Sequence, residues 1–266
     1  WFGFGVLLTV LLSVASAILS EFLMEKALRR PVTIDDGSAA VTGLLLALTL
    51  PAGTPWYVPV LGSVFAICIA KQVFGGLGDN FVNPALAGRA FLLASFPAAM
   101  TTYPLVADAV TSATPLSSEF AGSVDYLQAF IGRIGGCIGE VSTLALLIGA
   151  AYLLIRRVID WRIPLSYLGT MALLTVIGGG NVLDSVLLGG TVLGAFFMAT
   201  DYVTSPVTSW GRVIYGVGIG IINYTIRRWG AYPEGTTYAI LLMNIAAPLI
   251  ERFTRPRKYG EVKRHA

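Results

Sequence analysis

The chain has 266 residues, of which 55% are hydrophobic and only 12% are charged. Soluble globular domains carry about 25% charged residues, so this composition excludes an ordinary soluble protein and indicates an integral membrane protein. The dominance of apolar residues also excludes a disordered chain. A dispersed net charge of +3 gives no indication of nucleic-acid binding.

Few residues are suited to metal binding or nucleophilic catalysis. The two cysteines, Cys68 and Cys137, lie far apart and outside any CxxC pair, and the single histidine is His265 near the end. This pattern argues against a zinc site, an iron–sulfur cluster or a disulfide framework built from this chain alone. We therefore predict no metal site and no catalytic triad. Because the chain begins at Trp1 inside an apolar run, we also expect a preceding segment.

Three long apolar segments are predicted to be transmembrane helices. A spanning helix needs about 20 mostly apolar residues. The three segments are Trp1–Met24, Ile134–Ile155 with Glu140 inside it, and the shorter Ile163–Ile177.

Two further apolar segments are too short to cross a membrane. Asn83 and Pro84 precede ALAGRAFLLASF, which Pro97 closes; Asn is a favoured helix cap and Pro a favoured first helical residue. The resulting helix of about 14 residues is roughly 21 Å long, against a hydrocarbon core of about 30 Å. Ser38–Leu50, halted by Pro51, has the same character. We expect both to be broken or re-entrant helices, which in membrane proteins usually line a binding site.

The chain also repeats itself weakly. The segment Asp36–Pro55 resembles Asp184–Pro206. Four further residues recur as the same residue type 154 positions later in the chain. Trp56, Gly62, Gly76 and Ala85 correspond in this way to Trp210, Gly216, Gly230 and Ala239. Two units of three passes each would cross the membrane in opposite directions, as in transporters with inverted repeats. The predicted fold is therefore an all-α, polytopic helical bundle with two inverted repeats and half helices, of the urea-transporter type, with about nine spans counting the broken elements.

Basic residues set the predicted orientation. They cluster at 26–30, at 156–162 and in the tail, and the positive-inside rule places these segments on the cytoplasmic face of the inner membrane. The acidic segment 98–133 is then the outer loop, while Arg227 and Arg228 face outward as a local exception. We divide the chain into a first repeat at 1–133, a second repeat at 134–253 and a cytoplasmic tail at 254–266.

The outer loop contains the run Asp108-Ala-Val-Thr111-Ser112-Ala113-Thr114-Pro115. In an ordinary Ser/Thr-rich loop the hydroxyl groups bond the local backbone and the proline prevents a helix. The pattern D-x-x-[ST]-[GS]-A-T also resembles the flavinylation sequence of membrane redox subunits, in which the last Thr carries flavin mononucleotide (FMN) through a phosphoester bond. Thr114 is the candidate attachment site.

A second run gives this motif its context. Residues 75–91, GGLGDNFVNPALAGRAF, are followed after 22 residues by the threonine of TSAT, and TIDDGSAAVTGLLLALTLP precedes both. Together these runs resemble the membrane-embedded D subunit of the Rnf complex (RnfD) and its relative, the B subunit of the sodium-pumping NADH:quinone oxidoreductase (NqrB). The similarity covers most of the chain, and its length favours the Rnf protein. Ser112 fits the pattern but is a departure from the relative, which often has Gly there.

The resemblance implies an electron-transfer subunit of an ion-pumping complex that moves electrons between reduced ferredoxin and NAD. Its implied partners are the other Rnf subunits, membrane lipid and an outward-facing flavin transferase that uses FAD and Mg²⁺. A tethered flavin needs no nucleotide-binding fold. Within the motif Thr114 supplies the ester oxygen and Ala113 leaves room for the transferase. Thr111 and Ser112 form local hydrogen bonds, and Asp108 helps the transferase engage the loop or caps a turn.

Polar residues of the 75–91 run have structural and functional interpretations. An arginine at membrane depth must be paired or functional, and we favour pairing of Arg89 with an acid or with carbonyls of a broken helix over a direct flavin role. For Asn83 we favour helix capping. Asn80 and Asn83 are also candidates to bind a second, non-covalent flavin such as riboflavin, and for Asn80 neither role is preferred.

Other functions remain open on the sequence. Asp184 and Asp201 are candidates to balance Arg212 or to line a cation pathway, without an indication of sodium or protons. Inverted repeats also suit a channel or transporter for a small solute, and fold alone does not settle function. A purely structural anchor for other subunits is a third interpretation. The flavinylation motif discriminates, because a channel has no reason to keep it.

Overall fold

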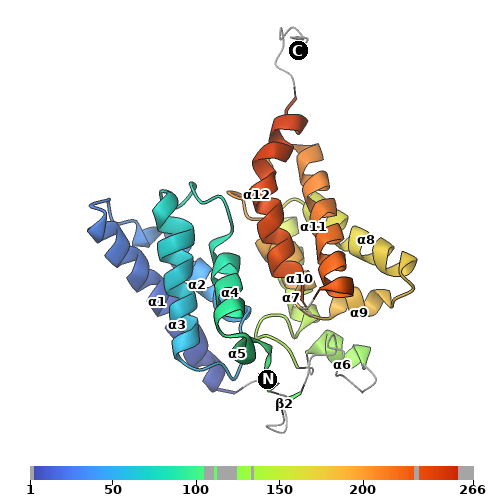
Figure 1. Cartoon of the computed structure of the whole chain (residues 1–266), viewed down its shortest axis with the longest axis horizontal. Helices are drawn as coiled ribbons and strands as arrows, with labels where there is room; N and C mark the ends of the chain where they lie inside the picture. Colours follow the sequence, from blue (N-terminus) through green and yellow to red (C-terminus); the bar gives the residue numbers. More distant parts are fainter. Residues whose placement is uncertain (1–2, 105–110, 113–124, 133–134, 231–233, 257–266) are drawn as a thin grey trace.

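The computed structural model describes residues 3–104, 111–112, 125–132, 135–230 and 234–256. The N-terminal unit consists of α1 (Gly5–Ala27), the short turn η1 (Ile34–Asp36), α2 (Ser38–Leu48), α3 (Tyr57–Phe65), α4 (Pro84–Ser95) and α5 (Pro97–Thr101). Beyond α3 the same helix continues through a π-helical turn, η2 (Ala66–Lys71), and a final 3₁₀ turn, η3 (Gln72–Phe74). This unit occupies the left of Figure 1.

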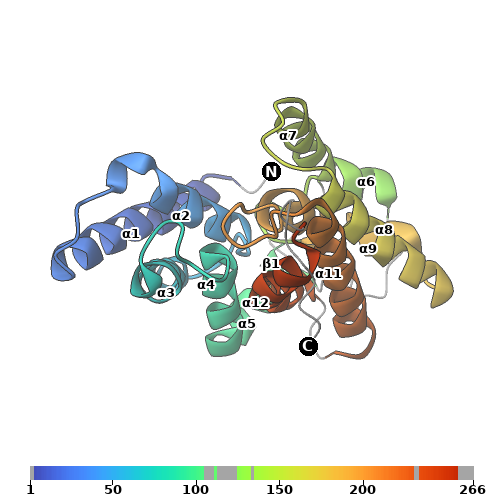
Figure 2. The same cartoon turned by 90° about the horizontal axis from the view of Figure 1, so that it is seen from above.

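The C-terminal unit lies beside it. It contains α6 (Tyr126–Ile131), α7 (Thr143–Ile155), α8 (Arg162–Ile177), α9 (Val182–Leu187), α10 (Thr191–Leu193) with the π-helical turn η4 (Gly194–Met198), α11 (Ser209–Trp229) and α12 (Thr236–Thr254). The units are joined through β1 (Tyr103–Pro104) and β2 (Thr111–Ser112), a two-residue antiparallel pair. Helix α4 packs against α12 where the units meet (Figures 1 and 2). The described chain is thus helical, as the sequence predicts.

Helix α1 has a polar inner face and an apolar outer face. Its buried residues are Thr9, Ser13, Ala17, Ser20, Glu21 and Glu25. Its exposed face carries Leu7, Leu8, Leu11, Leu19 and Leu23, each more than half exposed. This is the reverse of a helix in a water-soluble protein. It is typical of a membrane helix, which packs through small and polar residues while leucines contact lipid. Two described helices are long and apolar enough to span a membrane: Gly5–Ala27 and Tyr57–Phe74, with hydropathies of 2.2 and 1.7.

The two predicted half helices are confirmed. Helix α4 begins where Asn83 caps it, its side-chain oxygen accepting from the backbone N–H of Leu86 at 3.3 Å, with Pro84 at the first position. Helix α2 ends at Leu48, shortly before Pro51. With 12 and 11 residues, α4 and α2 are roughly 18 and 16 Å long at 1.5 Å per residue, so neither crosses a hydrocarbon core.

The predicted helix Ile134–Ile155 is wrong in its first half. Helix α7 begins only at Thr143, where the Ser142 hydroxyl accepts from the N–H of Ala145 at 3.3 Å, and residues 135–142 form turns. These turns complete the broken end of α2. The N–H groups of Ile138 and Gly139 donate to the carbonyls of Leu50 and Leu48, at 2.9 and 2.7 Å.

That pairing explains why the segment is not helical. Carbonyl groups at a helix end inside a membrane must find donors within the protein. A side chain at Gly139 would collide with Leu48, because a Cβ built there lies 2.5 Å from the Leu48 Cβ. The glycine-rich stretch therefore provides backbone donors at close approach, and Glu140 is not part of a transmembrane helix.

The described parts of the three basic segments lie at one end of the molecule. Arg30 at the end of α1 donates to the carbonyl of Gln72 at the end of the α3 helix. In the second unit, Arg162 donates to Ser209 at the start of α11, and the neighbouring Thr208 contacts Thr254 at the end of α12. The β1–β2 pair lies at the opposite end (Figure 1). Helices α1 and α3 therefore run toward the basic end, whereas α8 and α11 run away from it.

Candidate functional site

The structure describes only part of the run that the sequence analysis predicts to be a flavinylation motif. Thr111 and Ser112 form β2, in register with Pro104 and Tyr103 of β1. Asp108, Ala113 and Thr114 lie outside the described residues. The motif therefore continues directly from a strand that is paired at the end of the molecule opposite the basic segments (Figure 1).

A cavity of about 380 Å³ lies between the two units near the basic end. The half helices α2 and α4 both begin at it, with Ser38 and Pro84 in its wall. Helix N-termini present unpaired N–H groups and a partial positive charge. Apolar walls come from Leu45, Phe196 and Phe197. The cavity combines flat apolar surface with polar groups at the two helix starts.

Both predicted asparagines line this cavity. The Asn83 side chain has two structural roles, since its oxygen caps α4 and its Nδ2 donates to the carbonyl of Met198 at 3.3 Å across the unit boundary. The capping prediction is thus confirmed. Asn80 is also buried, and its Nδ2 donates to the carbonyl of Val82 at 3.1 Å.

Charged groups also lie at the cavity. Lys71 bonds the Ser38 hydroxyl at 2.5 Å and forms an ion pair with Glu21 at 2.6 Å. Partial burial alone would raise the pKa of Asp36, but hydrogen bonds from the Ser38 hydroxyl and N–H outweigh it and hold that pKa below its ordinary value. Burial raises the pKa of Asp201. The cavity therefore presents a cation and two carboxyl groups beside its aromatic wall.

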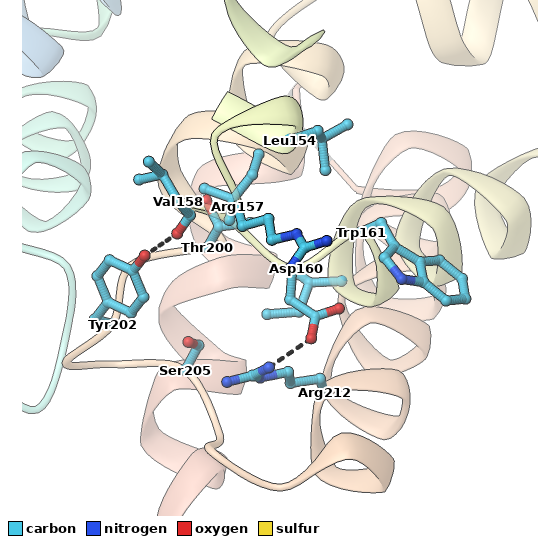
Figure 3. Close-up of a pocket in the computed structure, with 11 residues that line it drawn as sticks. Leu154, Arg157, Val158, Asp160, Trp161, Thr200, Tyr202, Ser205 and Arg212 are labelled. Carbon is cyan, nitrogen blue, oxygen red and sulfur yellow. Dashed lines mark hydrogen bonds and ion pairs between the residues drawn. The ribbon is translucent and has the colours of Figure 1, made fainter. Parts of the chain in front are cut away.

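Figure 3 shows a second cavity, of about 580 Å³, which shares part of its wall with the first. Val158, Ile159, Thr200 and Tyr202 line both cavities. The Tyr202 hydroxyl donates to the Val158 carbonyl, so this hydrogen bond lies at their shared wall (Figure 3).

Arg212 in this second cavity corrects one prediction. It pairs with Asp160 at 2.5 Å, in the connection between α7 and α8, and with neither Asp184 nor Asp201 (Figure 3). Asp184 instead accepts from the Tyr126 hydroxyl at 3.0 Å. Asp201 accepts from Thr204 at 3.0 Å. The acid that pairs with Arg212 is therefore Asp160, which lies in a short loop and was not among the predicted partners.

Arg89 is buried at the junction of the units, as its pairing interpretation predicts. Its Nη2 is 2.6 Å from Glu234, just before α12, and its Nη1 donates to the Thr49 carbonyl at the end of α2. The arginine thus combines both expected partners, an acid and a carbonyl of a broken helix. Glu234 and the neighbouring Glu140 were not among the predicted site residues. Glu140 could have been identified from the sequence, because it is an acid within an apolar stretch. Nothing in the sequence around Glu234 indicates that it belongs to a site.

No group of three or more His, Cys, Asp and Glu side chains within the described ranges is arranged to hold a metal ion. Lipid-facing leucines, half helices with internally satisfied ends and buried ion pairs together define a polytopic helical membrane protein. The family model for the NQR2, RnfD, RnfE family matches residues 1–260. The chain belongs to this family.

Individual relatives agree with this assignment. The D subunit of the Na(+)-translocating ferredoxin:NAD(+) oxidoreductase complex of Acetobacterium woodii is 52% identical over 270 residues, covering 98% of this chain and 85% of the relative. The corresponding protein of the proton-translocating complex of Clostridium ljungdahlii is 43% identical, covering 97% of this chain and 85% of the relative. The D subunit of the ion-translocating oxidoreductase complex of Stutzerimonas stutzeri is 39% identical, over 97% of this chain and 86% of the relative.

Proposed function

We propose that the chain is the covalently flavinylated, electron-transferring D subunit of an ion-translocating ferredoxin:NAD⁺ oxidoreductase, with FMN esterified to Thr114. The observation that carries the proposal is the predicted flavinylation motif in a chain 52% identical to the D subunit of such a complex. The isoalloxazine ring supplies the redox chemistry, and the protein sets its position. The other Rnf subunits and a flavin transferase are the proposed partners, as is membrane lipid.

Helix directions support the inverted repeats in this proposal. In each unit a long helix packs against a second long helix and a short one: α1 against α3 and α2, and α8 against α11 and α9. The two pairs of long helices run in opposite directions. The matched Trp56 and Trp210 stand at the starts of α3 and α11.

The arrangement of the ends supports the proposed orientation. The basic segments share one end, which by the positive-inside rule faces the cytoplasm. The β1–β2 pair and the motif that continues from it then face outward, where the transferase acts. The C-terminus is cytoplasmic in this orientation.

Changing Thr114 tests the main proposal. We expect wild-type protein, coexpressed with the transferase and run on a denaturing gel, to fluoresce and to carry an FMN mass increment. Thr114→Ala should lose both, because the change removes the oxygen that forms the ester. Thr102→Ala is the matched control, an exposed threonine of the same outer segment but outside the motif. An FMN increment that persists in Thr114→Ala refutes the attachment site, and a bare wild-type chain favours the channel function.

We further propose that the cavity at Asn80 binds the second, non-covalent flavin. Its volume of about 380 Å³ falls within the range of small-molecule sites, and it offers aromatic walls for a planar ring with polar groups for its edge. Asn80→Ala should lower the flavin released by denaturation and leave the covalent flavin unchanged. Asn181→Ala, at a helix cap outside this cavity, is the control. Equal release from wild type and Asn80→Ala would place the second flavin elsewhere.

A further inference from the structure

Two acidic side chains and one arginine meet at the junction of the units. Arg89 of α4 contacts Glu234 at 2.6 Å. The other oxygen of Glu234 accepts from the N–H of Gly190 at 2.8 Å. Glu140 accepts from the N–H of Cys137 at 2.8 Å through Oε1. Four chain segments therefore converge on this junction cluster, which we define as Arg89, Glu140 and Glu234.

One carboxyl oxygen of the cluster has no partner. Glu140 Oε2 is buried and accepts no hydrogen bond from any donor in the described chain. Glu140 and Glu234 are within side-chain hydrogen-bonding contact of each other, yet two ionised carboxylates have no hydrogen to share. A Cβ built on Gly190 would lie 3.1 Å from Glu140 Oε2 and 3.8 Å from Glu234 Oε1, so both carboxyl groups converge on this glycine.

If both glutamates of the junction cluster were ionised, one of the two negative charges would have no cation in contact with it. The exposed fractions of Arg89, Glu140 and Glu234 are 3%, 4% and 8%. The other titratable groups that face them are Cys137, Tyr103 of β1 and Arg227 of α11. Arg227 acts on Glu234 from a distance, because its N–H groups bond the carbonyls of Ser185 and Leu188 and the Thr191 hydroxyl. Of the two cations described at this junction, only Arg89 contacts a carboxylate.

Two buried carboxylates in contact do not both stay ionised. We propose that Glu140 holds an exchangeable proton and donates it from Oε2 to Glu234, so that the pair is a proton-binding site inside the membrane protein. Glu234 is the ionised member, because Arg89 and the Gly190 N–H already stabilise its charge. A proton on Glu140 Oε2 supplies the hydrogen that a hydrogen bond between the two carboxyl groups requires.

The position of this site gives it a consequence for the outer loop. Tyr103 pairs with Ser112 in the β1–β2 pair, and Tyr103 is within electrostatic range of both carboxyl groups. Gain or loss of the proton therefore changes the electrostatic field at the β1–β2 pair, from which the chain continues to Thr114. This consequence rests on the proposed function, whereas the proton site does not.

Infrared spectroscopy of the purified full chain tests the site. A protonated carboxyl group has a carbonyl stretch that is distinct from that of a carboxylate and shifts in D₂O. We expect this band in the wild-type minus Glu140→Gln difference spectrum and its loss on alkaline titration. Glu251→Gln, near the other end of α12, is the matched control and should retain the band. Absence of the band from the difference spectrum overturns the proposal.

Two further measurements distinguish a bound proton from a bound metal cation and from an ionised Glu140. The band should be the same in sodium and potassium salts at one pH; its loss on adding sodium would identify a metal-cation site and overturn the proton assignment. Glutamine mimics a protonated glutamate, so Glu140→Gln should keep a Tm near that of the wild type. A Tm as low as that of Glu234→Gln, or failure to fold, would show that the Glu140 carboxylate is required and overturn the proposal. Covalent flavin is scored in the same samples, so its absence is distinguished from absence of the proton.

Discussion

The junction cluster and the cluster around Asp160 contain opposite imbalances of charge. At the junction two carboxyl groups face one guanidinium, and the side chains of the Arg89–Glu234 pair are 4% and 9% exposed. At the second cavity two guanidinium groups share the carboxylate of Asp160. Arg212 lies 2.5 Å from it (Figure 3), and Arg162, which does not line the cavity, lies 3.3 Å from it. These side chains are 20–35% exposed.

Burial determines what each imbalance costs. Water and mobile ions screen the surplus positive charge near Asp160, so its ion pairs contribute little to stability. The junction has no such screening, and removing one partner there leaves a buried charge unpaired. A change to the ion pairs near Asp160 should therefore cost little stability, whereas removing one partner of the Arg89–Glu234 pair should cost much more.

The largest effect is expected for Glu234→Gln. This change removes the carboxylate that pairs with Arg89 and leaves the guanidinium buried, and breaking a buried pair in this way costs about 3–5 kcal/mol. Denaturation of the detergent-solubilised chain, followed by circular dichroism, measures the loss. Glu251→Gln provides the matched control, with little change expected. If both variants lose the same stability, the contrast between buried and screened charge is wrong.

Arg89→Lys should have a smaller effect. Lysine keeps the positive charge but loses the planar fork that reaches Glu234 and the Thr49 carbonyl at the same time. A buried acceptor left without its donor costs about 1–3 kcal/mol. The same denaturation measurement should place Arg89→Lys between the wild type and Glu234→Gln. Stability equal to the wild type would show that charge alone, without the fork, holds the junction.

Local signals explain which elements could be predicted from the sequence. Asn83 and Pro84 indicate the start of α4, and Pro51 follows the end of α2, so both half helices were predictable. The pairing of Arg89 was also predictable as a type of contact, because an isolated charge at membrane depth is too costly. These inferences need only neighbouring residues and the properties of the membrane.

Partner identity depends instead on how distant segments meet. Glu234 lies 145 positions from Arg89, and no periodicity connects them. The apolar run before α7 is typical of a helix, but residues 138 and 139 form turns, because their N–H groups donate to the carbonyls of Leu50 and Leu48 at the end of α2. The need of the α2 carbonyls for hydrogen-bond donors thus outweighs the local helix propensity of this segment. As a result, Glu140 lies at the junction.

The smallest effect is expected for Asp160→Asn, which removes the shared carboxylate from the partly exposed cluster. Exposed ion pairs contribute about 0–1 kcal/mol, and the two arginines left behind remain in contact with solvent. Partial burial alone would raise the pKa of Asp160, but the Arg162 N–H and the Arg212 guanidinium hold it below its ordinary value. Because the folded-state pKa is lowered, the contribution is fully present above the pKa of an unfolded-chain aspartate, about 3.9, and is lost as the pH falls through the folded-state value.

The Asp160 contribution should also be screened by salt, unlike that of the junction. Wild type and Asp160→Asn should therefore differ slightly at neutral pH and low ionic strength, and converge in acid or in high salt. Glu234→Gln should remain destabilised in high salt, because its unpaired arginine is beyond the reach of mobile ions. Denaturation of both variants at two salt concentrations measures this. A salt dependence shared by both would mean that water reaches the junction, and Glu140 would then need no proton to neutralise it.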